Sequence, residues 1–382
     1  MFLALIGGLL KVVLTFAWPS LAGTWADWFS IPIGWMRSML AWLDTFPGAS
    51  VPMPAPPFYL VAACFVLIAM TCFLRVRVGS RVLLVIVTAM AYLSILVIPV
   101  REAVLAKVAQ QDDLRITLLS VGAGQCAVVE TPGGRTIAID AGSTSLTDLW
   151  QKCLGPFLHV RGRSSIDTVI ISHGDSDHTS AVADVVNVYN VREVIAGARF
   201  IDNASEDMGT TSLLAELDLM ERPPRIVAPG EVLPLGRDTR IEFLWPTADG
   251  DTLADNDAGL VLKLTHAGRS VLFPADIQDA GMSGLLTAPE KITADVLIAP
   301  HHGSSEKSTE AFVAAVNPLA VISSNGRSMS NKQRRFETLI GGRPLFRTNE
   351  CGAVTITISR DGKLRVEPFL VGTMQAVELP RK

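Results

Sequence analysis

The chain has 382 residues, a length that allows two or three domains. Hydrophobic residues make up 49% of it and the mean hydropathy is +0.36, which excludes a purely soluble protein. Residues 1–107 hold 7 Lys/Arg and 3 Asp/Glu, whereas residues 108–382 hold 26 and 34, a formal net charge of −8 that disfavours broad nucleic-acid binding. The five cysteines include no CxxC pair, which argues against a disulfide framework or a thiolate zinc site.

Three apolar stretches predict that residues 1–107 form a membrane region. Residues 58–74 and 82–100 carry no charge, and each is near the length that a helix needs to cross a membrane. A buried core helix is the alternative, but two such runs close together favour a transmembrane hairpin. Residues 1–18 add a third membrane helix, since a signal peptide would not carry its lysine, Lys11, in the middle. Residues 34–44, with Trp35 and Trp42 at helical spacing, predict an interfacial helix.

The loop between the two charge-free runs sets the expected orientation. It carries Arg75, Arg77 and Arg81, and the positive-inside rule places such a loop in the cytoplasm. The second helix of the hairpin would then exit outward. We therefore predict a multi-pass protein of the inner (cytoplasmic) membrane whose residues after Arg101 are extracytoplasmic.

The second part opens with a predicted meander of strands. Residues 114–119 alternate polar and apolar side chains, as a half-buried strand does. A glycine turn over residues 121–127 (VGAGQCA) separates them from strands at 127–131 and 136–139, which a PGGR turn joins. The third strand ends in Asp140-Ala141-Gly142.

A dense set of metal-binding residue types follows the next predicted strand, residues 168–171. His173, Asp175, Asp177 and His178 lie within six positions, and imidazole and carboxylate both bind divalent metals. Four such ligands cannot all face one ion at ideal distances, so two adjacent ions are the natural interpretation; a solvated polar loop is the alternative. Residues 179–190 predict a helix whose amino-terminal dipole points towards the site.

Two further segments end in metal-binding residue types. We predict strands at residues 225–235, 240–245 and 259–265, then at 271–273, which leads to Asp276. A turn or capping role is the alternative for this Asp. A buried strand at 294–300 delivers His301 and His302, whose side chains would point opposite ways on an extended segment. Residues 354–358 and 364–369 predict closing strands. His159 and His266 belong to no motif and are expected to be surface or packing residues.

A basic run follows these histidines, with only Glu337 against it. It could border the cleft and hold phosphates, or it could form a solvated helix face. The run consists of Arg327, Lys332, Arg334, Arg335, Arg343 and Arg347.

Together these motifs resemble the metallo-β-lactamase-fold domain of the bacterial competence protein ComEC family. The HxDxDH pattern stands at residues 173–178, and a VGQGDA-like turn at 121–127. An IDAG turn at 139–142, a GD-like turn at 273–276 and an HHGS turn at 301–304 follow in the family's order. The apolar segments resemble the end of the family's membrane region, most of which is absent, so the chain is a short homologue, half of a split protein or an incomplete gene model.

The resemblance implies an α/β fold: an αββα metallo-β-lactamase sandwich over residues 108–382, preceded by an all-α transmembrane region. It implies two divalent ions, zinc or manganese. His173 and Asp175 would hold one ion, Asp177 and His178 the second, and the shared Asp276 both. One of His301 and His302 would complete the set; we expect His301 to be the ligand and His302 the catalytic, substrate-facing residue. Asp177 is alternatively the base.

Other residues receive supporting roles from the resemblance. Asp140 would orient the metal loop, and Asn256 would support the ligands or bind weakly. The neighbouring Asp255 and Asp257 are expected to be solvated. Phosphate binding would fall to Ser304 and four residues of the basic run, namely Arg327, Lys332, Arg334 and Arg335.

The implied function is a membrane-anchored, metal-dependent phosphodiesterase or nuclease that acts on DNA during uptake. Its partners would be DNA, the membrane and a separate channel subunit, because the chain is too short to form a channel alone. The rival interpretations are a hydrolase of a non-DNA ester, such as a phosphorylcholine ester or a lactone, and a non-catalytic membrane component of DNA uptake.

Overall fold

The computed structural model describes residues 14–44, short pieces between 58 and 93, residues 112–202, 207–246, 253–370, 372 and 374–381. The chain divides into two compact units, Met1–Met53 and Pro54–Lys382. The first contains η1 (Pro19–Leu21) and α2 (Ala22–Asp44). Helix α2 includes the helix expected at residues 34–44 and exposes Trp35 and Trp42. Its placement on a membrane surface stays a prediction.

The described part of the chain contains no helix long and apolar enough to cross a membrane. Most of residues 1–18, 58–74 and 82–100, on which the predicted membrane helices fall, lies outside the described residues. The transmembrane region and the boundary at residue 107 therefore remain predictions.

The second unit contains two β-sheets. The nine-stranded sheet is mixed, and in spatial order it consists of β16 (Val377–Leu379), β15 (Leu364–Pro368), β14 (Val354–Ile358), β1 (Leu114–Leu118), β2 (Ala127–Glu130), β3 (Thr136–Ile139), β4 (Thr168–Ile171), β5 (Glu193–Gly197) and β6 (Arg225–Val227). The seven-stranded sheet consists of β13 (Leu345–Arg347), β12 (Ala320–Ser323), β11 (Val296–Ile298), β10 (Arg269–Phe273), β9 (Val261–His266), β8 (Thr239–Trp245) and β7 (Val232–Pro234).

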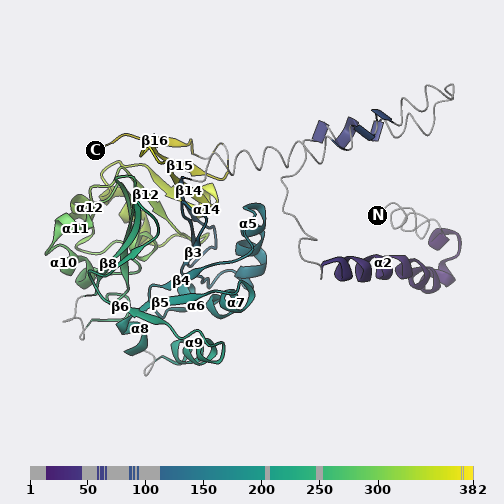
Figure 1. Cartoon of the computed structure of the whole chain (residues 1–382), viewed down its shortest axis with the longest axis horizontal. Coiled ribbons are helices and arrows are strands. Elements are labelled where there is room, and N and C mark those ends of the chain that lie inside the picture. Colours follow the sequence, from purple (N-terminus) through teal and green to yellow (C-terminus); the bar gives the residue numbers. More distant parts are fainter. Residues whose placement is uncertain are drawn as a thin grey trace. The chain divides into compact units, whose positions relative to one another are not determined.

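Helices cover the outer face of each sheet (Figure 1). Those on the nine-stranded sheet are η2 (Trp150–Leu154), α5 (Gly155–Val160), α7 (Val182–Val188) and α9 (Met208–Leu219). Those on the seven-stranded sheet are α10 (Asp279–Leu285), α11 (Pro289–Ile292), α12 (Thr309–Val316) and α13 (Asn331–Leu339). Short helices in the connections are α6 (Ser176–Thr179), α8 (Ala198–Asp202), η5 (Pro300–Gly303) and α14 (Thr348–Cys351). This αββα arrangement confirms the predicted fold class for this part of the chain.

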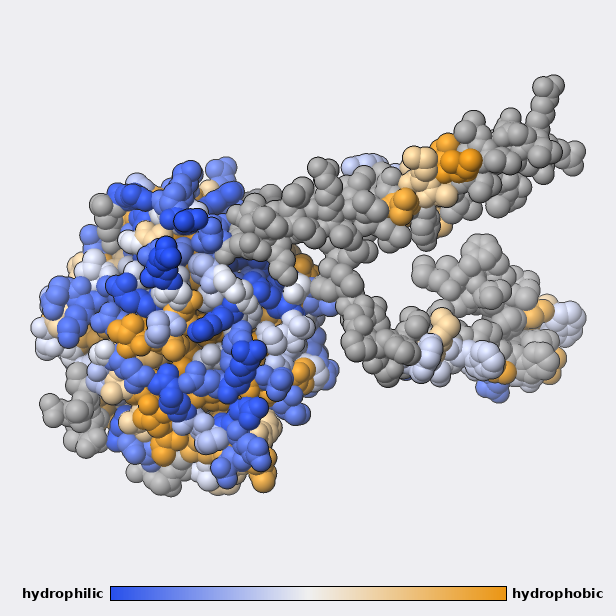
Figure 2. Space-filling model, in the orientation of Figure 1, coloured by the Kyte–Doolittle hydropathy of each residue, from blue (hydrophilic) through white to orange (hydrophobic). Residues whose placement is uncertain are grey.

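Alternation along the strands divides the apolar side chains among three cores. In β4, Ile170 packs into the core between the two sheets, whereas Val169 and Ile171 pack beneath the outer helices. On the face shown in Figure 2, hydrophilic residues predominate over the sandwich and hydrophobic ones are interspersed. The buried apolar layers therefore hold the two sheets together. The side chains that could bind a metal lie in the connections between strands.

Those loops gather where parallel strands end. Strand β3 pairs with β4 in parallel, and β10 pairs with β11 in parallel. Asp140 follows β3 directly, and Asp276 stands three residues after β10. The two sheets are joined at this edge, because the Leu260 amide donates to the Ser172 carbonyl at 2.8 Å. This shared edge brings loops from both sheets together.

Two predicted elements are divided in the structure. The helix expected at residues 179–190 is two helices, α6 and α7, and the first begins at Ser176, so that Asp177 and His178 lie on a helix. The strand segment at residues 225–235 forms β6 and β7, which belong to different sheets. Periodicity could not reveal this second division, because both halves are strands.

Candidate metal centre

Two glycine turns press against the helix that carries part of the centre. A Cβ atom at Gly142 would lie 2.4 Å from the carbonyl carbon of Asp177, and one at Gly124 would lie 2.6 Å from the Asp177 oxygen. The amide of Gln125 donates to that oxygen at 2.9 Å. The VGAGQCA and IDAG turns therefore fix the backbone of α6 through close approach, which only glycine permits.

Four metal-binding side chains meet at this edge. Ligand atoms of Asp177, His178, Asp276 and His302 all lie within 4.8 Å of one another. The Nε2 atom of His178 lies 3.2 Å from Asp276 Oδ1, and His302 Nε2 lies 3.1 Å from Asp177 Oδ2 and 3.4 Å from Asp276 Oδ2. His178 and Asp276 are buried. The cluster thus unites residues from both sheets.

Asp140 fixes the orientation of His178. Its buried carboxylate accepts hydrogen bonds from the Ser172 amide at 2.8 Å, the Ser172 hydroxyl at 2.9 Å and Gln125 Nε2 at 2.9 Å. It also lies 2.8 Å from His178 Nδ1. Because a carboxylate only accepts, Nδ1 must carry the proton, and the Nε2 lone pair of a neutral His178 points into the cluster.

The same logic assigns His173. The Ser172 hydroxyl donates to Asp140, so it accepts from His173 Nδ1 at 2.9 Å. His173 Nε2 is then a lone-pair acceptor, and this buried atom has no hydrogen-bond partner among the described residues. It lies 3.5 Å from Oδ2 of Asp175, a residue whose side chain is 46% exposed. His173 and Asp175 therefore form a pair beside the four-residue cluster.

Charge and burial compete within the cluster. Burial opposes the charged form of Asp276, but His302 and His178 hold the pKa of its carboxyl well below the usual value. Burial likewise opposes charge on His178, but Asp276 and Asp140 raise the pKa of its imidazole well above the usual value. Both shifts have one cause: the site stabilises positive charge between its carboxylates.

This donor set fits a divalent cation. Lone pairs of imidazole nitrogens and carboxylates that converge at such distances repel one another unless a proton or cation lies between them. The orphaned Nε2 of His173 is a second acceptor without a donor. Histidine and aspartate without thiolate suit zinc or manganese. The centre therefore offers a possible site for a divalent metal, and the assignment of individual ligands stays a prediction.

The two adjacent histidines do not lie on an extended segment, contrary to the prediction. Strand β11 ends at Ile298, and His301 and His302 adopt left-handed backbone conformations with φ of 48° and 52°. The turn places His302 in the cluster, while His301 Nε2 lies 3.9 Å from Asp276 Oδ2 and its side chain is 28% exposed. Which histidine binds metal stays a prediction, but the geometry favours His302.

The turn before Asp276 keeps a left-handed conformation although its sequence differs from that of the resembled family. Ala275 stands where the resemblance has glycine, and its φ is +54°, in the left-handed region that glycine prefers. The turn is therefore kept despite the side chain.

The loop between β8 and β9 differs from the prediction. Asp257 is buried rather than solvated, and its Oδ1 accepts the amides of Gln278 and Gly281 at 2.7 and 2.8 Å, which caps α10. Asn256 is partly buried and its carbonyl accepts the Gly259 amide at 3.0 Å. Neither residue belongs to the four-residue cluster.

The basic run separates into paired and exposed members. Arg347 is buried against Glu337, and Lys332 pairs with Glu306 at 2.6 Å. The Arg343 guanidinium bonds the carbonyls of Pro318 and Ile340, which is a structural role. Within the part of the chain that the structure describes, the exposed members that form no ion pair are Arg327, Arg334 and Arg335. Ser304 is partly buried and its amide donates to the His301 carbonyl.

Sequence reasoning missed four polar residues around the centre. Ser172 links Asp140 to both His173 and His178, and Gln125 holds Asp140. The others are Asn325 and Gln333, which contact the His302 backbone. Ser172 and Gln125 adjoin or belong to the recognised motifs, whereas Asn325 and Gln333 lie outside them.

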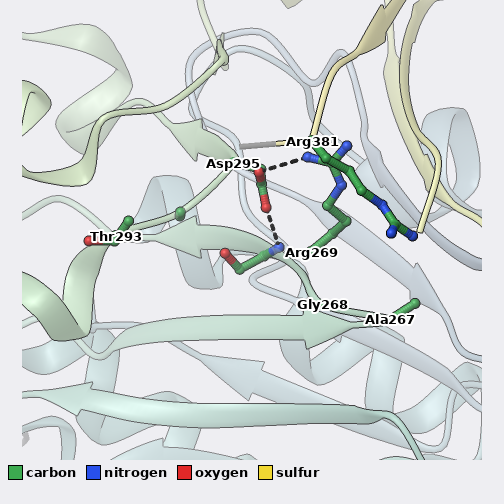
Figure 3. Close-up of a pocket in the computed structure, with 8 residues that line it drawn as sticks. Ala267, Gly268, Arg269, Thr293, Asp295 and Arg381 are labelled. Atoms are coloured by element: carbon green, nitrogen blue, oxygen red, sulfur yellow. Dashed lines mark hydrogen bonds and ion pairs between the residues drawn. The ribbon is translucent and has the colours of Figure 1, made fainter.

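A pocket of about 350 Å³ lies elsewhere, along the strand that starts at Arg269. Figure 3 shows Asp295 between the Arg269 side chain and the strand, where it accepts the guanidinium at 2.9 Å and the Ser270 amide at 2.9 Å. Arg269 also donates to the carbonyls of Gly362, Leu379 and Pro380. This buried arginine therefore ties the carboxy-terminal strand to the sandwich and uses four of its five N–H donors within the domain.

Comparison with known proteins agrees with the fold. The sequence profile described as the Metallo-beta-lactamase superfamily matches residues 119–324. ComE operon protein 3 of Bacillus subtilis (strain 168) is 26% identical over 226 residues, which cover 56% of this chain and 28% of that protein. Competence protein ComA of Neisseria gonorrhoeae is 24% identical over 270 residues, 68% of this chain and 35% of that protein. This chain therefore matches only about a third of the length of these relatives.

Among solved structures, the metallo-beta-lactamase fold protein YhfI from Bacillus subtilis is similar. It has a TM-score of 0.41 and 13% sequence identity, covering 62% of this chain and 96% of that one.

Proposed function

The chain belongs to the metallo-beta-lactamase superfamily, and from that premise we propose that it is a membrane-anchored, divalent-metal-dependent phosphodiesterase that cleaves DNA during uptake. The observation that carries the proposal is the four-residue cluster, because it joins two imidazoles and two carboxylates within 4.8 Å. Similarity to ComE operon protein 3 and to Competence protein ComA supports a role in competence. On that ground, DNA is the substrate that we propose.

The residues divide the work by position. His178, Asp276 and His302 would hold one divalent cation, and His173 with Asp175 a second beside it. Such cations would supply Lewis acidity towards the phosphodiester and lower the pKa of a bound water. Asp140 keeps His178 in the tautomer that a ligand needs, through the 2.8 Å contact to Nδ1.

Asp177 is the residue we assign as the base. Its side chain is 23% exposed, against 4% for Asp276, so solvent reaches its carboxylate more easily. Its Oδ2 lies 3.1 Å from His302 Nε2, so the carboxylate stands beside the residues that would hold the cation. A water on the exposed side would pass its proton to Asp177 as it attacks phosphorus, while the opposite P–O ester bond breaks and the departing sugar oxygen takes a proton from solvent.

DNA would contact the exposed arginines rather than the whole domain. Residues 108–382 carry a net charge of −8, so phosphates must be held locally. Arg334 and Arg335 lie on α13, whose Gln333 contacts the His302 carbonyl at 3.2 Å. This adjacency supports a phosphate path that leads past Arg327 to the metal centre.

Cleavage by the full purified chain tests the proposal. With manganese or zinc, it should degrade single- or double-stranded DNA, and Asp276→Asn should abolish cleavage. Asp184→Asn, an exposed carboxylate on α7, is the matched control and should cleave normally. Hydrolysis of model phosphoesters without DNA cleavage would favour a non-DNA hydrolase. Metal binding without turnover would favour the non-catalytic uptake component.

The proposed membrane topology has its own test. The apolar runs at residues 58–74 and 82–100 support anchoring, and the arginines between them support an extracytoplasmic domain. Reporter fusions after residue 107 should be active only with a reporter that works outside the cytoplasm. A channel subunit remains the expected partner, to be sought by co-purification from membranes.

A further inference from the structure

Three consecutive residues at the centre hold an unusual backbone conformation. His301, His302 and Gly303 have φ values of 48°, 52° and 75°, all in the left-handed region. Only glycine adopts that region readily, so the two histidines need outside contacts to stay there. The turn amides supply some: His301 donates to the Ala275 carbonyl at 3.1 Å, and Ser304 donates to the His301 carbonyl at 2.8 Å.

The carbonyl of His302 is held from a different direction. It accepts Asn325 Nδ2 at 2.9 Å and Gln333 Nε2 at 3.2 Å, so two side-chain amides fill both of its lone pairs. Asn325 is 2% exposed and lies just after β12. Its backbone amide donates to Thr348 Oγ1 at 3.1 Å. Gln333 lies in the first turn of α13. Both amides come from elements that packing already fixes.

We propose that Asn325 and Gln333 are positioning residues for the metal centre. By holding the His302 carbonyl, they keep the left-handed turn closed and the imidazole Nε2 at 3.1 Å from Asp177 and 3.4 Å from Asp276. Without them the peptide can relax towards an ordinary conformation, and the imidazole leaves the cluster. This inference rests on the proposed function, since it assigns these residues to the same metal site.

Gln333 also caps its own helix, and the two roles use different atoms. Its side-chain Oε1 accepts a hydrogen bond from the backbone amide of Ser330 at 2.8 Å. Its own backbone amide donates to Ser330 Oγ at 3.2 Å, and the two bonds together make a capping box. A glutamate at position 333 preserves that box, because carboxylate oxygen accepts equally well. The Gln333→Glu change removes the donor to His302 and sets a carboxylate oxygen against that carbonyl instead. Ser330→Ala removes the capping hydroxyl and leaves the Gln333 donor to the His302 carbonyl in place.

Zinc titration of the full chain tests the assignment. Gln333→Glu and Asn325→Ser should each weaken zinc binding about tenfold in calorimetry, the usual loss when a supporting contact is removed. The visible absorption of bound cobalt(II) should change as well, because the imidazole is displaced. Ser330→Ala should lower the melting temperature yet leave zinc affinity and the cobalt spectrum unchanged, since a cap contributes stability and not ligand position.

The outcomes separate this inference from the function on which it rests. If wild-type protein binds zinc, and both variants bind it equally well, the positioning role is wrong and the proposed function stands. If wild-type protein binds neither zinc nor manganese, both are wrong. Circular dichroism of each metal-free variant identifies any that fails to fold, and the other then decides. An equal loss of affinity in Ser330→Ala would assign the effect to helix stability and overturn the proposal.

Discussion

Replacing Asp140 with asparagine tests whether the Asp140 carboxylate orients the His178 imidazole in the centre. The carboxylate accepts Ser172 N, Ser172 Oγ and Gln125 Nε2, and holds His178 Nδ1. Asparagine has nearly the same shape and tolerates the left-handed conformation of Asp140, whose φ is 57°. The substitution therefore changes charge and acceptor number while the backbone stays as it is.

The magnitude follows from the contacts. Whichever way the new amide lies, its NH₂ group faces at least one buried donor, which costs about 1–3 kcal/mol. The remaining contacts lose the charge that makes them roughly twice as strong as neutral hydrogen bonds. We expect a loss of about 3 kcal/mol in the free energy of unfolding. Zinc affinity should fall by about 10- to 100-fold, because His178 loses the charged partner that orients it.

Urea unfolding and zinc calorimetry measure the two effects. The control is Asp167→Asn, whose Oδ2 accepts the Thr136 amide at 2.9 Å just before β4, away from the centre. It should destabilise the domain by about 1 kcal/mol, as loss of one such hydrogen bond does, and leave zinc affinity unchanged. Wild-type zinc affinity in Asp140→Asn would refute the orienting role. A loss below about 1 kcal/mol would refute the hydrogen-bond accounting.

Three further predictions concern other parts of the domain. Gly142→Ala places a Cβ 2.4 Å from the His178 amide nitrogen, so unfolding free energy should fall by about 3 kcal/mol in urea, and near-neutrality would contradict the close packing. Burial lowers the pKa of His266, so as the pH falls below about 6.5 the unfolded state takes up the imidazole proton before the folded state does. The free energy of unfolding of the wild type should therefore fall more between about pH 7 and about pH 5 than that of His266→Asn. Parallel curves of unfolding free energy against pH would exclude this. Arg334→Gln with Arg335→Gln should weaken single-stranded DNA binding and reduce its log–log salt slope by about 1.4, whereas an unchanged slope would remove both from the phosphate path.

The fold was predictable where local pattern and burial agree. Strands β3, β4 and β14 have the predicted bounds, because each is a short apolar or alternating run between turn residues. The short strands β12 (Ala320–Ser323) and β13 (Leu345–Arg347) were not predicted, since runs of four and three residues are too short to show a clear alternation. The apolar runs that predict membrane segments are equally plain in sequence, but they fall mostly outside the described residues, so that prediction stays open.

The site was predictable through its ligand types but not through its supports. Dense histidine and aspartate marked Asp177, His178, Asp276 and the His301–His302 pair. Whether His301 or His302 joins the cluster depends on a left-handed turn, which the expectation of an extended strand missed. Asn325 and Gln333 contact the His302 carbonyl, which lies more than twenty residues away in sequence, and no local sequence pattern predicts such a contact.

The origin of the cluster in both sheets has a thermodynamic consequence. His178 follows a strand of one sheet and Asp276 a strand of the other, so an unfolded chain cannot present the two together. An ion bound only by the folded state adds its free energy to the stability of the whole domain, about 4 kcal/mol at a thousand times its dissociation constant. Metal supply would then control how much folded protein survives proteolysis, as well as how much is active.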